Sequence, residues 1–408
     1  MKNNVYDTLT KRGILAQATH PEKIRELLGN SRVTFYIGFD PTADSLHIGH
    51  FVQIMVMAHM QRAGHRPIAI MGGGTAKIGD PSGRSDMRKM LTDEDINNNV
   101  EAIKKQFSRL IDFSDSRALM INNASWLDEL NYVRFIRDIG IHFSVNKMLS
   151  AECFRSRFEK GLNFLEFNYM LMQSYDFYRL YKDHDCILQL GGDDQWSNII
   201  AGIELIRRKE GAEAYGLTFN LLTTSEGTKM GKTEKGALWL DPEKTSPYEF
   251  YQYLRNVGDA DVINAVRMLT FIDLEEIEEM SKLEGADLNT VKERLAFEVT
   301  KTVHGLENAQ KAQEAARQIF EKGSVSEDMP VFELSSGSIP LNILDLCHIS
   351  GLVPSKTEAR RLITQNGLFL NDEKVENFSL EIDSGFFDDN RMAVLRKGKK
   401  TYMGIKLI

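Results

Sequence analysis

Apolar runs alternate with helical stretches over the first 240 residues of this 408-residue chain, and this alternation limits the possible folds more than any other feature. Strand-like apolar runs occupy residues 33–39, 67–72, 186–191 and 216–222, and a helical stretch fills 47–63. The alternation predicts an α/β fold, namely a Rossmann-like, doubly wound parallel sheet with helices on both faces. Ligands of such sheets bind beyond the carboxyl ends of the strands, at the point where the strand order reverses.

The rest of the chain divides by composition into three parts. The sheet domain extends over 1–242, and residues 243–321 then follow a helical pattern. Residues 322–340 mix glycine, serine, proline and acids, as linkers do, and 341–408 contain the patterns of two short helices and several strands. We therefore expect an α-helical domain, a linker and a small α+β domain after the sheet domain.

Composition narrows the class of protein. With 42% hydrophobic and 26% charged residues, the chain has the composition of an ordinary water-soluble globular protein. Its three cysteines, Cys153, Cys186 and Cys347, have no paired spacing, so neither a disulfide framework nor a zinc site is expected. No stretch resembles a signal-peptide core or a membrane span, which predicts a cytoplasmic protein without membrane contact.

The net charge of −8 disfavours nucleic acid as a partner of the whole surface, since phosphate contacts need clustered Lys and Arg. The end of the chain is different, because residues 340–408 carry ten Lys and Arg against nine Asp and Glu. Arg396, Lys397, Lys399 and Lys400 lie within five residues of one another. The cluster has two interpretations of equal weight. It is either the solvated face of a hairpin or a basic patch that restricts RNA binding to this end of the chain.

His47 and His50 follow the first apolar run and open the helical stretch. Because they are three residues apart, both imidazoles point the same way beside the free N–H groups of the first helical turn, which makes an anion-binding corner. Much further along the chain, the glycine-bounded loop 227–236 carries Lys229 and Lys232, which can close over a polyphosphate. The two stretches together predict an ATP site.

These stretches resemble the HIGH and KMSKS signatures of the class I aminoacyl-tRNA synthetases. Five ordered motifs resemble the bacterial tyrosyl-tRNA synthetases in particular: GFDPTADSLHIGH at 38–50, GDPSG at 79–83, NYMLMQSYD at 168–176, GGDDQW at 191–196 and GTKMGKTEKGALWLD at 227–241. The segment SKTEARRLITQNGLFLND, within 341–408, resembles the αL-type RNA-binding domain of the same family. The resemblance covers nearly the whole chain.

The resemblance implies a tyrosine–tRNA ligase. Such an enzyme activates L-tyrosine with ATP to tyrosyl-adenylate and pyrophosphate, and then transfers tyrosine to the 3′-terminal adenosine of tRNA(Tyr) with release of AMP. It also implies that the helical domain 243–321 faces the tRNA anticodon side and that the enzyme is a homodimer. Residues 135–150 resemble the dimer interface of the family, although an apolar helix is more often part of a core.

Tyr169, Gln173 and Asp176 share one face of a predicted helix, at i, i+4 and i+7. A polar stripe of this kind is more often a solvent-exposed surface, and the residues alone leave that interpretation open. The resemblance implies that Asp176 and Tyr36 hydrogen-bond the substrate phenol and that the other polar groups hold the α-ammonium. The tyrosine-binding set so implied is Tyr36, Asp80, Tyr169, Gln173, Asp176 and Gln195.

The resemblance also implies how ATP is bound. The catalytic set contacts phosphates and ribose and consists of Thr42, His47, His50, Arg84, Arg88, Lys229, Lys232 and Thr233. The remaining nucleotide contacts come from Gly38, Asp40, Gly49, Gly192 and Asp194, together with Lys232. Each of these glycines has a simpler interpretation as a turn residue. No general base is required, because the attacking tyrosine carboxylate is already ionised.

ATP is expected as a substrate accompanied by Mg²⁺, which binds mainly through the phosphates. No zinc and no organic cofactor are expected, since the histidine pair lacks a third ligand nearby and the glycine-rich stretch 72–83 lacks the lysine-hydroxyl ending of a P-loop. Two departures from the family pattern matter. Gly231 and Thr233 replace the serines of KMSKS, so a hydroxyl at 231 is lost, and Ile37 offers no polar contact to the ribose.

Three other functions compete with this interpretation. A tryptophanyl-tRNA synthetase shares the architecture, but Tyr36 with Asp176 suits a phenol better than an indole. A small nucleotidyltransferase carries an HxGH motif but has neither the helical domain nor the RNA-binding tail. A synthetase-derived RNA-binding protein without activity should have lost several of the histidines and lysines that are present here.

Overall fold

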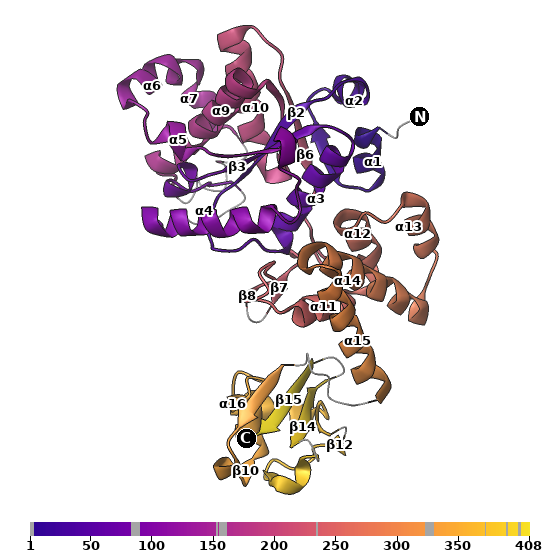
Figure 1. The fold of residues 1–408 in the computed structure, drawn as a ribbon. Helices are drawn as coiled ribbons and strands as arrows, with labels where there is room; N and C mark the ends of the chain where they lie inside the picture. Colours follow the sequence, from indigo (N-terminus) through magenta and orange to yellow (C-terminus); the bar gives the residue numbers. More distant parts are fainter. Residues whose placement is uncertain are drawn as a thin grey trace. The chain divides into compact units, whose positions relative to one another are not determined.

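The computed structural model describes residues 4–82, 90–151, 154, 161–233, 236–322, 330–371, 373–388, 391–398 and 401–408, with the side chains of 232, 233 and 318–322 left out. Arg84, Arg88 and Cys153 therefore lie outside the described residues, as do Lys399 and Lys400. The chain divides into two compact units (Figure 1). The first comprises Met1–Thr245 and Gly258–Val291, and the second Ser246–Val257 and Lys292–Ile408.

A six-stranded sheet lies at the centre of the first unit. Its strands are β1 (Leu15–Ala18), β2 (Thr34–Phe39), β3 (Arg66–Met71), β4 (Leu119–Asn122), β5 (Cys186–Gly192) and β6 (Tyr215–Phe219). They lie in the order β1-β6-β5-β2-β3-β4, and all neighbours are parallel except β1 and β6. This confirms the predicted doubly wound parallel sheet. The order reverses between β2 and β5, so a ligand site is expected at the carboxyl ends of these two strands.

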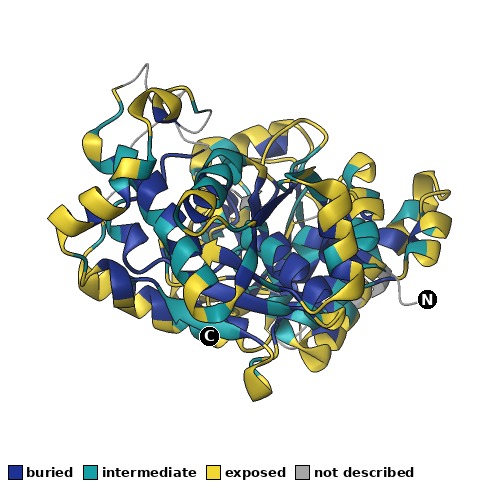
Figure 2. Cartoon of the chain, turned by 90° about the horizontal axis from the view of Figure 1, so that it is seen from above, coloured by how far each residue is buried: buried dark blue, intermediate teal, exposed yellow. Residues whose placement is uncertain are grey.

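Helices cover both faces of the sheet (Figure 1). α3 (Ile48–Arg62) connects β2 to β3, and α4 (Asp93–Phe107) precedes β4. α9 (Phe164–His184) and α10 (Trp196–Glu210) flank β5 in the chain and lie on the opposite face from α3 and α4. Right-handed crossovers require this arrangement when the chain runs outward in both directions from the centre of the sheet. The central strands β2, β3, β5 and β6 are accordingly mostly buried, in the dark blue interior of Figure 2, which explains why their sequences are continuous apolar runs.

Local sequence determines where the site-forming helices begin and end. The side chain of Asn163 accepts a hydrogen bond from the Glu166 backbone N–H at 2.9 Å and so caps α9, and the Glu166 side chain returns a bond to the Asn163 backbone. Asp185 ends the helix in a left-handed conformation, with φ of 54°. α9 is therefore fixed at both ends, so its polar face is held toward the sheet.

Two strands escaped the sequence analysis because they are short. β1 pairs antiparallel at the edge of the sheet, and β4 is the outer parallel strand, with four half-buried residues. The shorter elements of the first unit are α1 (Val5–Lys11), α2 (Pro21–Asn30), α5 (Ala124–Leu127), α6 (Tyr132–Asp138), α7 (Val145–Leu149), α12 (Asp259–Leu269), α13 (Leu274–Met280) and the two-residue strands β7 (Lys232–Thr233) and β8 (Gly236–Ala237). Among the described helices, none combines the length and apolar character that crossing a membrane requires.

Residues predicted as helical after the sheet domain are helical. They form α11 (Pro247–Arg255), α12 and α13, α14 (Leu288–His304) and α15 (Leu306–Lys322). Within the first unit, the buried Arg12 guanidinium donates to the backbone carbonyls of Arg267 at 3.0 Å and Thr270 at 2.9 Å. It thereby satisfies carbonyls at the end of α12 that would otherwise lack partners.

The C-terminal part of the second unit has its own apolar core. A five-stranded sheet in the order β12-β11-β14-β15-β9 packs against α16 (Ile343–Ile349) and α17 (Lys356–Thr364). The sheet strands are β9 (Val331–Leu334), β11 (Leu368–Leu370), β12 (Glu373–Lys374), β14 (Met392–Lys397) and β15 (Thr401–Leu407), and β10 (Leu341–Asn342) pairs separately with β13 (Glu381–Ile382).

The stretch 322–340, predicted as a linker, contributes to this fold. β9 pairs in parallel with β15, and its Leu334 is buried in the C-terminal core. The four-residue strand was not predicted, because glycines and serines on either side of it dominate the composition of the stretch. The C-terminal sheet therefore starts at Val331 rather than after the predicted boundary at 340.

Candidate active site

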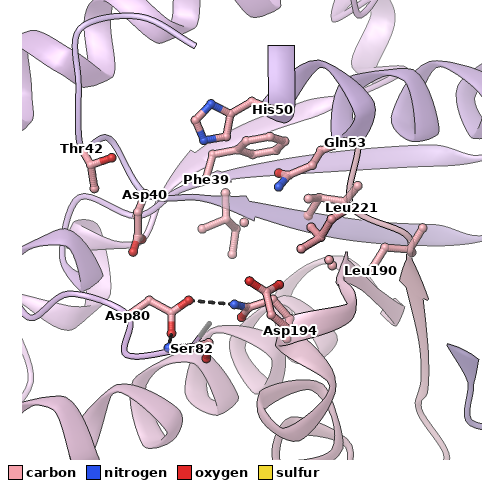
Figure 3. A pocket seen from close by; sticks show the side chains of 18 of the residues that line it. Phe39, Asp40, Thr42, His50, Gln53, Asp80, Ser82, Leu190, Asp194 and Leu221 are labelled. Atoms are coloured by element: carbon pink, nitrogen blue, oxygen red, sulfur yellow. Dashed lines mark hydrogen bonds between the residues drawn. The ribbon is translucent and has the colours of Figure 1, made fainter. Parts of the chain in front are cut away.

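A cavity of about 620 Å³ opens at the carboxyl ends of β2 and β5, where the strand order reverses. Every predicted site residue whose side chain is described lines it, together with the predicted glycines: Tyr36, Gly38, Asp40, Thr42, His47, Gly49, His50, Asp80, Tyr169, Gln173, Asp176, Gly192, Asp194, Gln195 and Lys229. Arg84 and Arg88 lie outside the described residues, and of Lys232 and Thr233 only the backbone is described, in β7. Figure 3 shows part of this cavity.

Asp176 forms the buried end of the cavity. Its two carboxylate oxygens accept hydrogen bonds from the indole N–H of Trp126 at 2.7 Å and the amide of Asn123 at 2.9 Å. Burial raises the pKa of Asp176 to about 7, although both hydrogen bonds act in the opposite direction, and the nearby charge of Asp40 raises it further. The carboxyl group is therefore poised to change its charge near neutral pH.

Tyr36 lies beside this carboxyl group, on β2. Its side chain is 2% exposed, its ring packs on Phe177 at 5.3 Å, and its hydroxyl has no hydrogen-bond partner among the described residues. Burial, followed by the charge of Asp176, raises its pKa well above the usual value for tyrosine, so the hydroxyl stays protonated. A buried phenol that lacks a partner is costly, and a polar group of a ligand would satisfy it.

Carboxylates and amides line the adjacent part of the cavity. Asp80 accepts from the Gln195 amide at 2.7 Å and the Ser82 backbone N–H at 2.9 Å, as the dashed lines in Figure 3 indicate. Gln195 in turn accepts from the amide of Gln173 at 3.2 Å, and the buried Gln173 carbonyl oxygen has no partner among the described residues. This chain of bonds holds an acceptor-rich, anionic surface that suits a small cation.

Asp40, predicted to contact the nucleotide, is turned toward this anionic surface. It accepts hydrogen bonds from the Tyr169 hydroxyl at 3.0 Å and the Thr75 hydroxyl at 2.8 Å. Asp194 lies across the cavity, and burial, followed by the charge of Asp80, raises its pKa. The hydrogen bond from Tyr169 joins the Asp40 carboxylate to the tyrosine-binding set.

His47 and His50 form the opposite end of the cavity, at the start of α3. Nδ1 of His47 accepts from the Gly49 backbone N–H at 3.1 Å, and Nδ1 of His50 accepts from the His47 backbone N–H at 3.3 Å. The two rings stack with centroids 3.9 Å apart. Because each Nδ1 acts as an acceptor, a neutral ring carries its proton on Nε2.

The electrostatics of His47 favour this neutral form. Burial lowers its pKa, and the positive charge of Lys229 contributes in the same direction. Lys229 is exposed at the rim of the cavity, two residues before the glycine that precedes β7. This end therefore offers imidazole N–H donors, the Thr42 hydroxyl and a lysine cation, the groups that bind phosphate oxygens.

Several functional contacts were missed in the sequence. Asn123 and Trp126 follow β4, and because β4 itself was not predicted, nothing placed these side chains at the ligand edge of the sheet. Asn123 also donates to the Thr75 hydroxyl at 3.1 Å, so it joins Asp176 to the surroundings of Asp40. The carbonyl oxygen of Gln189 is buried at the cavity with no partner among the described residues. Gln189 lies opposite Tyr36 in the β2–β5 pairing, which could have been found only from the strand register.

The sequence profile described as "tRNA synthetases class I (W and Y)" matches residues 28–321, and the profile described as "Tyrosine--tRNA ligase SYY-like C-terminal domain" matches 316–405. A tyrosine–tRNA ligase of Acetivibrio thermocellus is 60% identical over 408 residues, which is 100% of both chains. A tyrosine–tRNA ligase of Caldanaerobacter subterraneus subsp. tengcongensis is 60% identical over 399 residues, 98% of each chain.

Solved structures agree in fold. The C-terminally truncated mitochondrial tyrosyl-tRNA synthetase of Aspergillus nidulans superposes with a TM-score of 0.70 at 26% identity, covering 78% of this chain and 95% of the other. The corresponding enzyme of Coccidioides posadasii gives a TM-score of 0.67 at 28% identity, covering 77% and 92%. A tryptophanyl-tRNA synthetase of Encephalitozoon cuniculi, 14% identical over 76% of this chain and 89% of the other, gives a TM-score of 0.57 and shares the fold alone.

Proposed function

This chain belongs to the tyrosine–tRNA ligases, within the class I tRNA synthetases, and from that premise we propose how its residues divide the work. The enzyme activates L-tyrosine with ATP to tyrosyl-adenylate and pyrophosphate, and then transfers the tyrosyl group to the 3′-terminal adenosine of tRNA(Tyr), releasing AMP. The observation that carries our assignment is the pairing of Tyr36 and Asp176 at the buried end of the cavity.

The substrate phenol binds between Tyr36 and Asp176. Its O–H donates to Asp176, and the Tyr36 hydroxyl, which has no partner among the described residues, donates to the phenol oxygen. Phenylalanine cannot make either bond and would leave the buried Tyr36 hydroxyl unsatisfied and remove a hydrogen bond from Asp176, which costs far more than a missing methylene. Tyrosyl-tRNA synthetases are themselves the standard example of such discrimination.

The α-ammonium group binds the anionic surface. Asp80, Tyr169 and Gln173 hold it, and Gln195 keeps Asp80 and Gln173 in place through the hydrogen bonds at 2.7 Å and 3.2 Å. We now include Asp40 with this group, because the Tyr169 hydroxyl donates to it at 3.0 Å. The carboxylate of the substrate is thereby directed toward the end of the cavity that contains the histidines.

ATP occupies the histidine end. Backbone at Gly38, Gly49 and Gly192 leaves room for the nucleotide, and Asp194 meets the ribose. His47, His50 and Thr42 donate to ribose and phosphate oxygens. The loop residues Lys229, Lys232 and Thr233, together with Arg84 and Arg88, contact the phosphates in this proposal. The residues move no proton in this step; they align the two substrates and stabilise the charge that grows on the leaving pyrophosphate.

Mg²⁺ accompanies ATP in this proposal. Imidazole N–H, hydroxyl and ammonium groups bind phosphate oxygens and are not ligands that Mg²⁺ prefers. Asp40 and Asp80 are engaged by hydrogen bonds at the amino-acid end. The described residues therefore fit a metal ion that is held through the phosphates of ATP and by water, and that neutralises phosphate charge when bound.

The C-terminal domain and the helices of 243–321 bind tRNA(Tyr) in this proposal, the helices on the anticodon side. Support comes from the profile match over 316–405 and from cations on the described surface, including Lys356 and Arg361 of α17 and Arg396 and Lys397 of β14. The cytoplasm is the proposed location, where the free, buried thiols of Cys186 and Cys347 would stay reduced.

We propose that the enzyme is a homodimer, because large apolar side chains are exposed on α6, on the 3-10 turn Gly140–His142, on α7 and at the start of α9. This exposed apolar patch consists of Tyr132, Val133, Ile136, Ile141, Val145, Leu149 and Phe164. Ile141 and Val133 are 76% and 72% exposed. The helices that carry the patch share the core cluster of Phe135, Met148 and Leu171, so the patch rests on a rigid support.

Ile141→Asp should convert the dimer to monomers. A two-fold axis brings the same surface of both subunits together, so the substitution places two carboxylates in one apolar interface. We expect the dimer dissociation constant to rise by roughly a hundredfold or more, as measured by analytical ultracentrifugation. Leu283→Asp, at an exposed leucine outside the patch, is the matched control. A dimer unchanged by Ile141→Asp would place the interface elsewhere.

Amino-acid-dependent exchange of labelled pyrophosphate into ATP tests the whole assignment, with tyrosine, phenylalanine and tryptophan in parallel. Exchange with tyrosine alone is expected, because only a phenol satisfies both Tyr36 and Asp176. Exchange with phenylalanine at a comparable rate would contradict the proposed role of Tyr36 and Asp176. Exchange with tryptophan would show that the cavity binds an indole.

Tyrosine affinity should depend on pH through Asp176. Its pKa is raised to about 7, so the carboxyl is largely protonated at pH 6 and ionised at pH 8, and only the ionised form is a full acceptor for the phenol O–H. We expect the affinity measured by equilibrium titration to be roughly tenfold weaker at pH 6 than at pH 8. The ATP KM should not follow the same curve.

Asn123→Ala should move this pH midpoint upward, because the hydrogen bond from Asn123 lowers the pKa of Asp176. Asn122→Ala is the matched control, since the Asn122 side chain accepts instead from the Ala124 backbone N–H at 3.0 Å. An unchanged midpoint in Asn123→Ala would mean that another group controls the pH dependence.

A further inference from the structure

Gly231 adopts a conformation and a position that other residues cannot take. Its φ is +90°, in the left-handed region, and a Cβ built on it would lie 2.1 Å from Cγ2 of Ile48. Ile48 is the first residue of α3 and is 1% exposed, so it has little freedom to move away. The side chain of Ile48 thus occupies the space that any side chain at 231 would need.

The same contact is part of a backbone ladder that joins the loop to the start of α3. The Leu238 N–H donates to the Gly231 carbonyl at 2.8 Å, and the Ile48 N–H donates to the Leu238 carbonyl at 3.0 Å. A neighbouring β-bridge pairs His47 with Trp239. The loop is therefore held next to the two histidines by these backbone interactions together with the close approach of Gly231 to Ile48.

We propose that Gly231 is a positioning residue for activation: its missing side chain seats the loop on Ile48, so that Lys229 and Lys232 reach the same phosphates as His47 and His50. Lys229 lies two residues before the seat and Lys232 one residue after it, so a shift at 231 moves both. The inference rests on the proposed function of the loop. It also changes the meaning of the departure from KMSKS, because a serine at 231 could not be seated in this chain.

Two glycines of the loop allow the effect of the contact between Gly231 and Ile48 to be separated from the effect of backbone strain. Gly227 also has a positive φ, +78°, but a Cβ there would meet nothing within 4 Å. Gly227→Ala therefore introduces the strain of a left-handed alanine alone, whereas Gly231→Ala adds the overlap with Ile48. The difference between the two variants isolates the contact.

The test uses the full chain and measures the rate of tyrosyl-adenylate formation in single turnover, together with the equilibrium dissociation constant for tyrosine. We expect Gly231→Ala and Gly231→Ser to slow adenylate formation by roughly tenfold to a hundredfold more than Gly227→Ala does. Tyrosine affinity should stay within about twofold of the parent, because tyrosine binds without the loop. A merely misfolded variant would lose both quantities.

Ile48→Ala provides a second arm, since it removes the Cγ2 that Gly231→Ala would meet. In this background the additional effect of Gly231→Ala should shrink to that of Gly227→Ala. The proposal is overturned if Gly231→Ala equals Gly227→Ala, or if Ile48→Ala leaves its effect unchanged. Lys232→Ala distinguishes failure of this inference from failure of the proposed function. If Lys232→Ala and Gly231→Ala both leave adenylate formation unchanged, the proposed role of the loop is wrong. If Lys232→Ala slows adenylate formation and Gly231→Ala does not, only the seating of Gly231 on Ile48 is contradicted.

Discussion

His47→Asn should slow tyrosyl-adenylate formation by roughly a hundredfold to a thousandfold while leaving the protein as stable as the parent. His47 has two roles at the start of α3: Nδ1 accepts the Gly49 N–H and caps the helix, and Nε2 of the neutral ring carries the proton that we assign to phosphate binding. Asparagine is a strong helix cap but is too short to present a donor where Nε2 lies. The variant therefore keeps the first task and loses the second.

His47→Ala is the companion variant, because it loses both tasks. Its rate should fall as far as that of His47→Asn, and its free energy of unfolding should also fall by about 1 kcal/mol, the usual worth of a helix cap. Single-turnover kinetics and chemical denaturation measure the two quantities. If His47→Asn kept the parental rate, the imidazole would serve only as a cap and the assignment of a phosphate donor would be wrong.

Removal of residues 330–408 should abolish charging of tRNA(Tyr) while sparing tyrosine-dependent pyrophosphate exchange. The cavity is lined by residues no later than Ala237, and the removed part has a core formed by its own residues, from Leu334 to Leu407. Loss of the phosphate contacts that we propose for this part should weaken tRNA binding by roughly a thousandfold or more. Both activities are measured on the same preparation, so loss of exchange as well would mean that the tail supports the fold of the first unit.

The position of the cut is itself a test of the structure. A cut after residue 340 would leave β9 without β15, its parallel partner, and would expose an unpaired strand edge. We expect that shorter truncation to aggregate, whereas the cut before residue 330 should give a well-behaved protein. Light scattering during heating distinguishes the two.

Local pattern was sufficient to predict which elements would carry the candidate site residues, while their proposed roles came from the family resemblance. The histidines lie at the start of the helix that follows β2 in the chain, and Tyr169, Gln173 and Asp176 share one helical face, so their convergence follows from the doubly wound fold. The four central parallel strands, β2, β3, β5 and β6, were also predictable, because strands buried on both faces are continuous apolar runs.

What escaped prediction depends on relations between elements. Asn123 and Trp126 act only because the short β4 lies beside β3, which places them against Asp176. The orientation of Asp40 is set by Thr75 and Tyr169, which lie 35 and 129 residues away in the chain. The need for glycine at 231 similarly comes from Ile48, which no inspection of the loop sequence could indicate.

The two ends of the cavity differ in how they respond to protons, and this difference has a physiological consequence. Burial moves the pKa of Asp176 up to about 7, while burial and Lys229 move that of His47 down. In the proposed arrangement, acidification by one pH unit from neutrality would thus weaken tyrosine binding before it affected ATP binding. If Asp176 receives the substrate phenol as proposed, a fall in pH would act on this enzyme like a fall in tyrosine concentration, and tRNA(Tyr) charging would slow at limiting tyrosine while ATP binding stayed unchanged.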